Sequence, residues 1–121
     1  MFRRMVFNVV ARNQDDHTRN IAFLMDQEGL WRLAPAFDVI WAYNSTGKWT
    51  NRHQMSLNGK RDHFTRQDIL SVAEQFGIKG ASDILAQVVE AVARWPQVAD
   101  EAGVPAELKK QIARTHRLRL T

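Results

Sequence analysis

The stretch IAFLMDQEGLWRLA, residues 21–34, sets the fold of the first half of the chain. Two short apolar runs flank the segment QEG, which ends in Gly29. Apolar runs joined by a glycine-bearing turn are typical of two antiparallel strands. Pro35 follows the second run and ends it, because proline has no N–H to donate to a partner strand. The stretch therefore predicts one small β-hairpin.

From Thr65 onward the apolar residues recur with helical spacing. The segment TRQD predicts a capping box, with Thr65 as the N-cap and Asp68 three positions later. Gly77 is expected to end this helix. Ser82 is predicted to cap a second helix, which Pro96 ends or kinks. The apolar stripe of that second helix comprises Ile84, Leu85, Val88, Val89, Val92 and Ala93.

A third helix is predicted from near Pro105 to the end of the chain, because proline suits the first helical turn. Its inward residues are expected to be Leu108, Ile112 and Leu118. Residues 1–11 fit a short helix or strand, and QMSLNGK fits a short additional strand.

These elements predict a mainly α fold with a small β-hairpin, in the α+β class. We expect a single domain over residues 1–121. Within it, residues 1–60 carry the polar loop and the hairpin, and residues 61–121 form a helical bundle.

Composition narrows the class of protein further. The chain has 121 residues, no cysteine and a net charge of +4, and no stretch reaches membrane-spanning length. Without cysteine, disulfides and thiolate metal sites are excluded, and we expect a cytoplasmic protein with no membrane partner. The excess charge lies in residues 105–121, where a terminal helix would place basic groups at its C-terminal dipole end. Direct nucleic-acid binding is therefore not expected.

The segment NQDDHTRN, residues 13–20, places polar groups between two apolar runs. Asn20 follows Asp15 after four intervening residues, and Phe37-Asp38 comes just after the hairpin. Protein kinases use an Asp and an Asn at this spacing to orient the attacking hydroxyl and to bind a metal ion, and a later Asp binds the metal as well. Mg²⁺ prefers oxygen ligands. The order predicts Asp15 as the catalytic acid/base, with Asn20 and Asp38 as metal ligands.

Other interpretations of this loop stay open. Asx-rich turns form readily because Asn and Asp bond their own backbone, so a solvated turn is the simplest alternative. His17 is expected to brace the loop through side-chain hydrogen bonds, Arg19 to be solvated or near phosphate, and Asp16 to be exposed. A metal-dependent nuclease using Asp15, His17 and Asp38 is a further alternative.

The motifs DDHTRN and RLAPAFDVI resemble the D-x-H-x-K-N loop and the L-x-P-x-Y/F-D metal motif of the HipA family. These are bacterial serine/threonine kinases, the toxins of toxin–antitoxin pairs. Arg19 replaces the usual Lys, and Phe37 is an accepted variant. HQMSLNGK and GIKGASDIL also resemble the family, so the likeness covers nearly the whole chain. It implies a protein-kinase-like C-lobe in which Asp15 acts as the acid/base, while Asn20 and Asp38 bind Mg²⁺.

The resemblance also implies ATP as the phosphoryl donor, a protein substrate of the aminoacyl-tRNA synthetase class, and a HipB-like helix-turn-helix antitoxin as partner. A kinase also needs a glycine-rich phosphate loop and a lysine-bearing strand. The six glycines are scattered, and Lys48 and Lys60 follow the metal motif. We therefore expect the ATP-binding N-lobe to be absent and this chain alone to be inactive.

A non-catalytic remnant that binds an antitoxin-like partner is the alternative function. Trp31, Trp41 and Trp49 are expected to be core residues or a face that an N-lobe covers. Exposure of such a face would favour self-association.

Overall fold

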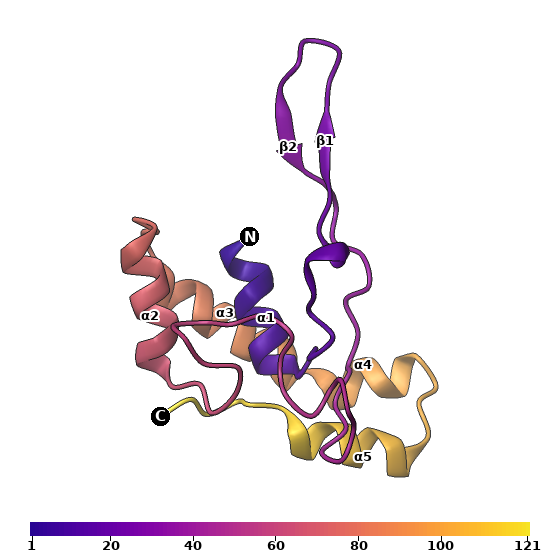
Figure 1. The fold of residues 1–121 in the computed structure, drawn as a ribbon. Helices are drawn as coiled ribbons and strands as arrows, with labels where there is room; N and C mark the ends of the chain where they lie inside the picture. The colour runs from indigo at the N-terminus through magenta and orange to yellow at the C-terminus, as the bar shows by residue number, and fades with distance from the viewer.

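The computed structural model describes residues 1–121 and contains five α-helices and one antiparallel hairpin. Figure 1 shows the helices forming the body of the molecule, from which the hairpin projects. The helices are α1 (Phe2–Ala11), α2 (Arg66–Gln75), α3 (Ala81–Ala93), α4 (Trp95–Glu101) and α5 (Ala106–Thr115). The strands are β1 (Phe23–Met25) and β2 (Trp31–Leu33), and a 3₁₀ turn, η1, spans Thr18–Asn20. The α+β class predicted from the sequence is confirmed.

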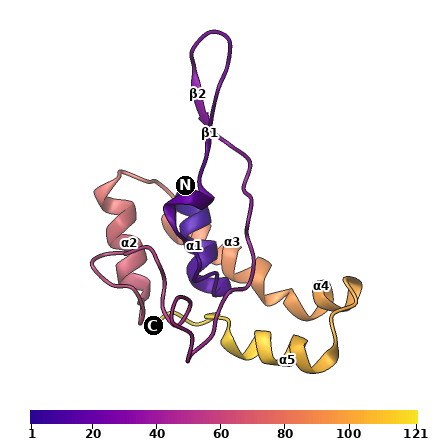
Figure 2. The same cartoon turned by 45° about the vertical axis from the view of Figure 1, so that its right-hand side comes forward.

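The hairpin forms where its apolar runs and turn predict it. Phe23 pairs with Leu33 and Met25 with Trp31. Gly29 adopts a left-handed conformation with φ 82°, which glycine accepts without steric cost. The Asp26 carboxylate closes the turn by accepting hydrogen bonds from the backbone N–H groups of the turn. Both views show the hairpin standing away from the helices (Figures 1 and 2).

The hydrophobic core lies between the first helix and the helices of the second half. The N-terminal segment, which the sequence left open between helix and strand, is helical, and α1 packs mainly against α3. Leu85, Val88 and Val92 of the predicted α3 stripe are buried, and Ile84 and Val89 are partly buried at its edge. Ala93 is exposed, so its assignment to the stripe was wrong. Burial of such side chains contributes on the order of 1.5–3 kcal/mol each. The loop that follows α1 is therefore attached to a packed element.

Both hydrogen bonds of the predicted α2 capping box are present. The backbone N–H of Asp68 donates to Thr65 Oγ1 at 3.2 Å, and the backbone N–H of Thr65 donates to the Asp68 carboxylate at 2.8 Å. Lys60 Nζ donates to the same carboxylate at 2.8 Å. The helix ends at Gln75, and Gly77 follows with φ 63°. The cap of α3 is Gly80 and not Ser82, which lies inside the first turn, so that prediction was wrong.

Helix α3 ends at Ala93, shortly before Pro96, as predicted, but the helix that follows it was not expected. A separate helix, α4, begins at Trp95 with Pro96 in its first turn, where the missing N–H costs nothing. The final helix, α5, begins after Pro105 as predicted but ends at Thr115. Of its expected inward residues Ile112 is buried, whereas Leu108 and Leu118 are exposed, so those two assignments were wrong.

The segment after α5 is extended and returns across the body toward α2 (Figures 1 and 2). The backbone N–H of Arg66, at the start of α2, donates to the carbonyl of Thr121 at 3.4 Å. Arg114 lies in the last turn of α5, as the dipole interpretation predicts, whereas Arg117 and Arg119 lie in the tail beyond the helix, which corrects that interpretation for these two residues. The sequence QMSLNGK forms a tight turn with one bridge between Leu57 and Lys60 instead of a strand.

The tryptophans are not core residues. Trp31 at the hairpin and Trp49 in the segment from Asn44 to Gln54 expose 67% and 64% of their surface. Trp41 is partly buried and donates from Nε1 to Thr115 Oγ1 at 2.8 Å, so it ties the segment after the hairpin to α5. No helix combines the length and the apolar character that crossing a bilayer requires.

Candidate functional site

The polar loop leaves α1 through Arg12, whose φ of 60° turns the chain sharply. In the residues that follow, burial alternates. Gln14 and Asp16 are buried, whereas Asp15 and His17 are partly exposed. Successive side chains of an extended backbone point to opposite sides. The loop therefore sends one pair of side chains into the protein and the other pair to the surface.

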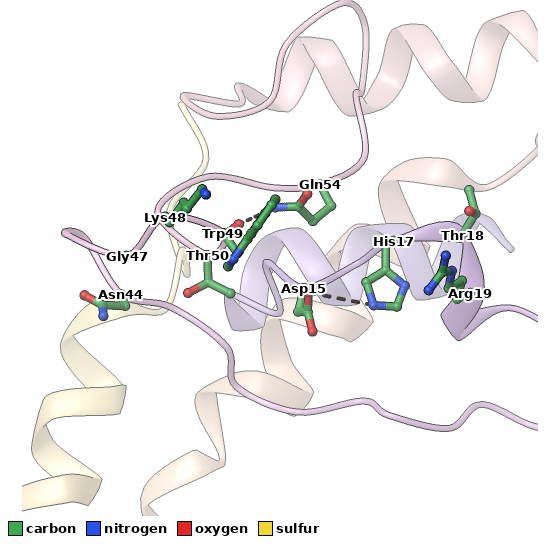
Figure 3. Close-up of a pocket in the computed structure, with 10 residues that line it drawn as sticks. All are labelled: Asp15, His17, Thr18, Arg19, Asn44, Gly47, Lys48, Trp49, Thr50 and Gln54. Carbon is green, nitrogen blue, oxygen red and sulfur yellow. Dashed lines mark hydrogen bonds and ion pairs between the residues drawn. The ribbon is translucent and has the colours of Figure 1, made fainter.

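Asp15 lies in a surface cleft of about 930 Å³. The cleft is formed between the polar loop and the segment from Asn44 to Gln54 (Figure 3). The Asp15 carboxylate lies 3.8 Å from Nε2 of His17, and both side chains are 40% exposed. A partly exposed carboxylate in a polar cleft is accessible to a hydroxyl group that is to lose its proton. Lining residues also include Thr18, Arg19, Gly47, Lys48, Trp49 and Thr50.

Asn20 and Asp38 line a second, smaller cavity of about 130 Å³, and His17 and Thr18 belong to the walls of both cavities. Asn20 donates from Nδ2 to the backbone carbonyl of Asp15 at 3.1 Å, which leaves its Oδ1 free to accept. Asp38 has a left-handed backbone, with φ 54°, and its exposed carboxylate has no hydrogen bond or ion pair within the chain. The structure thus brings Asn20 and Asp38 to one cavity and Asp15 to the adjoining cleft.

The oxygens of this small cavity suit a hard divalent cation, because Mg²⁺ prefers carboxylate and carboxamide ligands. Three buried polar atoms without a hydrogen-bond partner belong to residues of its wall: Arg4 Nη1, Asn13 Oδ1 and His17 Nδ1. Such unsatisfied groups are uncommon in a folded protein and indicate a place where water or a polar ligand binds. The oxygens of Asn20, Asp38 and Asn13 therefore fit a cation, whereas the donor Arg4 Nη1 fits an anionic group such as a phosphate beside it.

No group of three or more His, Asp or Glu side chains in the chain has the arrangement of a metal site. The nuclease alternative required Asp15, His17 and Asp38 to act together on a metal ion. The structure does not gather the three side chains into such a group, so its geometry gives no support to this interpretation.

Asp16 was expected to be exposed and is instead buried, with a side chain only 2% exposed. Its Oδ2 lies 2.7 Å from Nδ1 of His53. Its Oδ1 accepts hydrogen bonds from the backbone N–H groups of Gln54 and Met55, at 2.8 and 3.2 Å. A buried carboxylate is tolerated because these donors replace the water that it loses. Asp16 therefore anchors the loop to the segment at residues 53–55.

His17 does not brace the loop by hydrogen bonds, contrary to expectation. Its Nδ1 is buried without a partner, and its Nε2 only faces Asp15. Bracing comes from Asp16 and from Gln14, whose Nε2 donates to the carbonyl of Thr50 at 2.9 Å. Arg19 is exposed at the cleft without a hydrogen bond to the protein, as its solvated interpretation predicts.

Sequence reasoning missed the largely buried polar cluster behind the loop. Arg117, from the tail, reaches His53, Gln14 and Asp62, and Arg12 also contacts Asp62 at 3.8 Å. Burial opposes ionisation of Asp62, but a hydrogen bond from the His63 backbone and the charges of Arg117 and Arg12 lower its pKa overall. Partners so far apart in sequence leave no local pattern that would reveal them.

Comparison with protein-family models gave a match to the HipA-like C-terminal domain over residues 1–96. The match includes the polar loop, the hairpin, Asp38 and helices α1 to α3. The chain therefore belongs to the family of HipA-like C-terminal domains, as the resemblance of its motifs predicted. No curated protein and no solved structure matches the chain significantly.

Proposed function

We propose that this chain is the C-terminal, kinase-like portion of a HipA-like serine/threonine kinase, which transfers the γ-phosphoryl group of ATP to a protein hydroxyl. The observation that carries the proposal is the pair of adjoining cavities. One presents the Asp15 carboxylate, and the other presents the free oxygens of Asn20 and Asp38. Family membership adds to this geometry.

The role that we propose for each residue follows from the cavity in which it lies. Asp15 lies in the larger cleft, where it would orient the substrate hydroxyl and accept its proton. Asn20 and Asp38 would hold Mg²⁺, which neutralises phosphate charge when it is bound. The Nδ2 bond from Asn20 to the Asp15 carbonyl sets these two functions at a fixed distance within one loop. Phosphoryl transfer depends mainly on such positioning.

ATP binding requires more than these residues. Lys60, one of two lysines near the metal motif, is already paired with Asp68. Lys48 lies in the cleft beside the exposed Trp49 ring. Because neither lies on a strand beside a glycine-rich loop, we propose that a separate ATP-binding lobe completes the site. The exposed apolar hairpin is the surface that we assign to contact with that lobe.

Metal binding tests the site. We expect Mn²⁺ to bind weakly, because nucleotide phosphates normally supply part of the coordination shell. Titration of the chain with Mn²⁺ by electron paramagnetic resonance should show this binding, and Asp38→Ala and Asn20→Ala should abolish it. Asp26→Ala, which removes a carboxylate from the hairpin turn, serves as the matched control and should leave it unchanged. Equal Mn²⁺ affinity of Asp38→Ala and the unaltered chain would refute the site.

The second candidate is a non-catalytic module that binds a HipB-like antitoxin. Five large apolar residues of the hairpin region are exposed, which favours a binding surface whether or not the chain catalyses. These residues are Phe23, Leu24, Met25, Leu30 and Trp31. The protein substrate, proposed to be of the aminoacyl-tRNA synthetase class, rests on the family resemblance alone.

A further inference from the structure

The tail beyond α5 enters the protein through Arg117. Its backbone N–H donates to the carbonyl of Val10 at 2.8 Å, and its Nη1 donates to the carbonyl of Val9 at 3.0 Å. The guanidinium also pairs with the Asp62 carboxylate. Only 10% of the Arg117 side chain is exposed. These contacts fix the guanidinium beneath the C-terminal end of α1, where the polar loop begins.

The same guanidinium determines the state of His53. Nη1 of Arg117 lies 3.0 Å from Nε2 of His53, and His53 is completely buried. Because a guanidinium can only donate, Nε2 must accept and therefore carries no proton. The imidazole is then neutral, with its proton on Nδ1. That proton points at Asp16 Oδ2, which lies 2.7 Å from Nδ1.

The chain of contacts ends in the loop that carries the proposed catalytic residues. Asp16 lies between Asp15 and His17, and its inward direction is coupled to the outward direction of both neighbours. Without the Asp16 carboxylate the loop would keep the contacts of Gln14 and the bond from Asn20 Nδ2 to the Asp15 carbonyl, but it would lose its attachment to residues 53–55 next to Asp15. Gln14 itself accepts from Arg12 Nη1 at 2.9 Å and from Arg117 Nη2 at 3.4 Å.

We propose that Arg117 and His53 are positioning residues for Asp15. Arg117 holds His53 in its Nδ1–H form, His53 holds the Asp16 carboxylate, and Asp16 holds the loop so that Asp15 and His17 face the cleft. The inference deepens the proposed function, on which the role of Asp15 rests. Arg117 and the tail lie outside the family-matched residues 1–96, so this assignment comes from the structure of this chain.

The contacts that run from Arg117 through His53 to Asp16, called the relay below, predict a spectroscopic signature in the unaltered chain. Long-range ¹H–¹⁵N NMR spectra of the imidazole rings at neutral pH should show His53 as the neutral Nδ1–H tautomer. Its Nδ1 proton should exchange slowly, because it is buried and hydrogen-bonded. An Nε2–H tautomer, or a doubly protonated ring, would overturn the proposal without any variant having to fold.

Variants of the tail test whether the relay reaches the loop. Arg117→Met should accelerate amide exchange of residues 14–18 by roughly tenfold or more, as expected from the loss of a hydrogen bond to a charged group. Arg117→Lys keeps a cationic donor and should restore part of the protection. Arg119→Met removes an exposed arginine of the same tail and should change nothing.

Amide exchange at Leu85 and Val88, in the core of α3, distinguishes a local effect on the loop from destabilisation of the whole protein. Exchange that accelerates in the loop alone supports positioning, and an unchanged loop overturns it. If Arg117→Met fails to fold, the His53 tautomer measured in the unaltered chain decides whether the proposal holds. None of these measurements needs a metal ion or ATP. A positive relay together with absent Mn²⁺ binding would therefore reject the proposed function while leaving the contact chain in place.

Discussion

Asp16 and His53 form a buried carboxylate–imidazole pair, with Oδ2 and Nδ1 2.7 Å apart and both side chains almost completely excluded from solvent. The two residues are separated by 37 positions in the chain. Their contact joins the polar loop to the turn that precedes α2. The first half of the loop is therefore attached to the folded body, whereas Thr18 and Arg19 are exposed.

Removal of the Asp16 carboxylate should destabilise the protein strongly. Asp16→Ala leaves His53 and the backbone N–H groups of Gln54 and Met55 without their acceptor. Leaving a buried donor without its acceptor costs about 1–3 kcal/mol for each group. Urea unfolding followed by circular dichroism measures the loss. Asp15→Ala, a change of the partly exposed neighbour, is the matched control and should stay within about 0.5 kcal/mol.

Asp68 should make stability depend on pH at the acidic end. Hydrogen bonds from Lys60 Nζ and from the Thr65 backbone hold the pKa of Asp68 well below its ordinary value of 3.8. A lowered folded-state pKa stabilises the fold above pH 3.8, and the stabilisation is lost as pH falls from there toward the lowered value. Asp68→Asn should therefore cost stability at pH 7, and the cost should shrink progressively below about pH 4.

The control for this experiment is Asp83→Asn, an exposed acid in the first turn of α3. Its free energy of unfolding should follow that of the unaltered chain at every pH within about 0.5 kcal/mol. A cost for Asp68→Asn that stays constant from pH 7 down to pH 2 would show that charge is not the cause.

The hairpin should drive self-association when no partner covers it. Trp31 and Leu24 are 67% and 51% exposed on strands that pair with each other and project from the body (Figure 1). Trp31→Arg should shift the chain toward monomer in sedimentation experiments with little change in melting temperature. Phe76→Arg, a change at an equally exposed apolar residue after α2, is the comparison. A chain that is monomeric throughout would contradict the prediction.

The isolated chain should not turn over ATP. It contains no lysine-bearing strand beside a glycine-rich loop, and Lys60 is held by Asp68. Incubation with radiolabelled ATP and Mg²⁺ should release no phosphate above background. Turnover that disappears in Asp15→Asn would show that the chain is active without a further lobe.

Local features of the fold were predictable from the sequence, and distant ones were not. The Thr65–Asp68 capping box and the hairpin around Gly29 depend on residues only a few positions apart, and both are present. Pro96 was ambiguous, because a proline that ends one helix also suits the first turn of the next. Helix α5 ends at Thr115 because Arg117 is drawn into contact with α1, a tertiary effect that no helical pattern records.

The candidate site was likewise predictable from the sequence only in part. The order of Asp15, Asn20 and Asp38 along the chain indicated which residues to examine, and the structure places them around two adjoining cavities. The burial of Asp16 was missed because its partner His53 is remote in sequence. A carboxylate in a polar stretch is exposed by default, and only a specific donor changes that.

Locating a bound cation by NMR tests most directly whether Asn20 and Asp38 form the metal site of a phosphoryl-transfer loop. Mn²⁺ added in small amounts broadens the signals of nuclei close to it. The site proposed here predicts that broadening begins at the amides and side chains of Asn20 and Asp38 and spreads to Asp15 and His17, while signals of α2 and α3 stay sharp. Broadening centred on the exposed acids Asp26, Asp83 or Glu107, with Asn20 and Asp38 unaffected, would contradict the assignment of this loop to phosphoryl transfer.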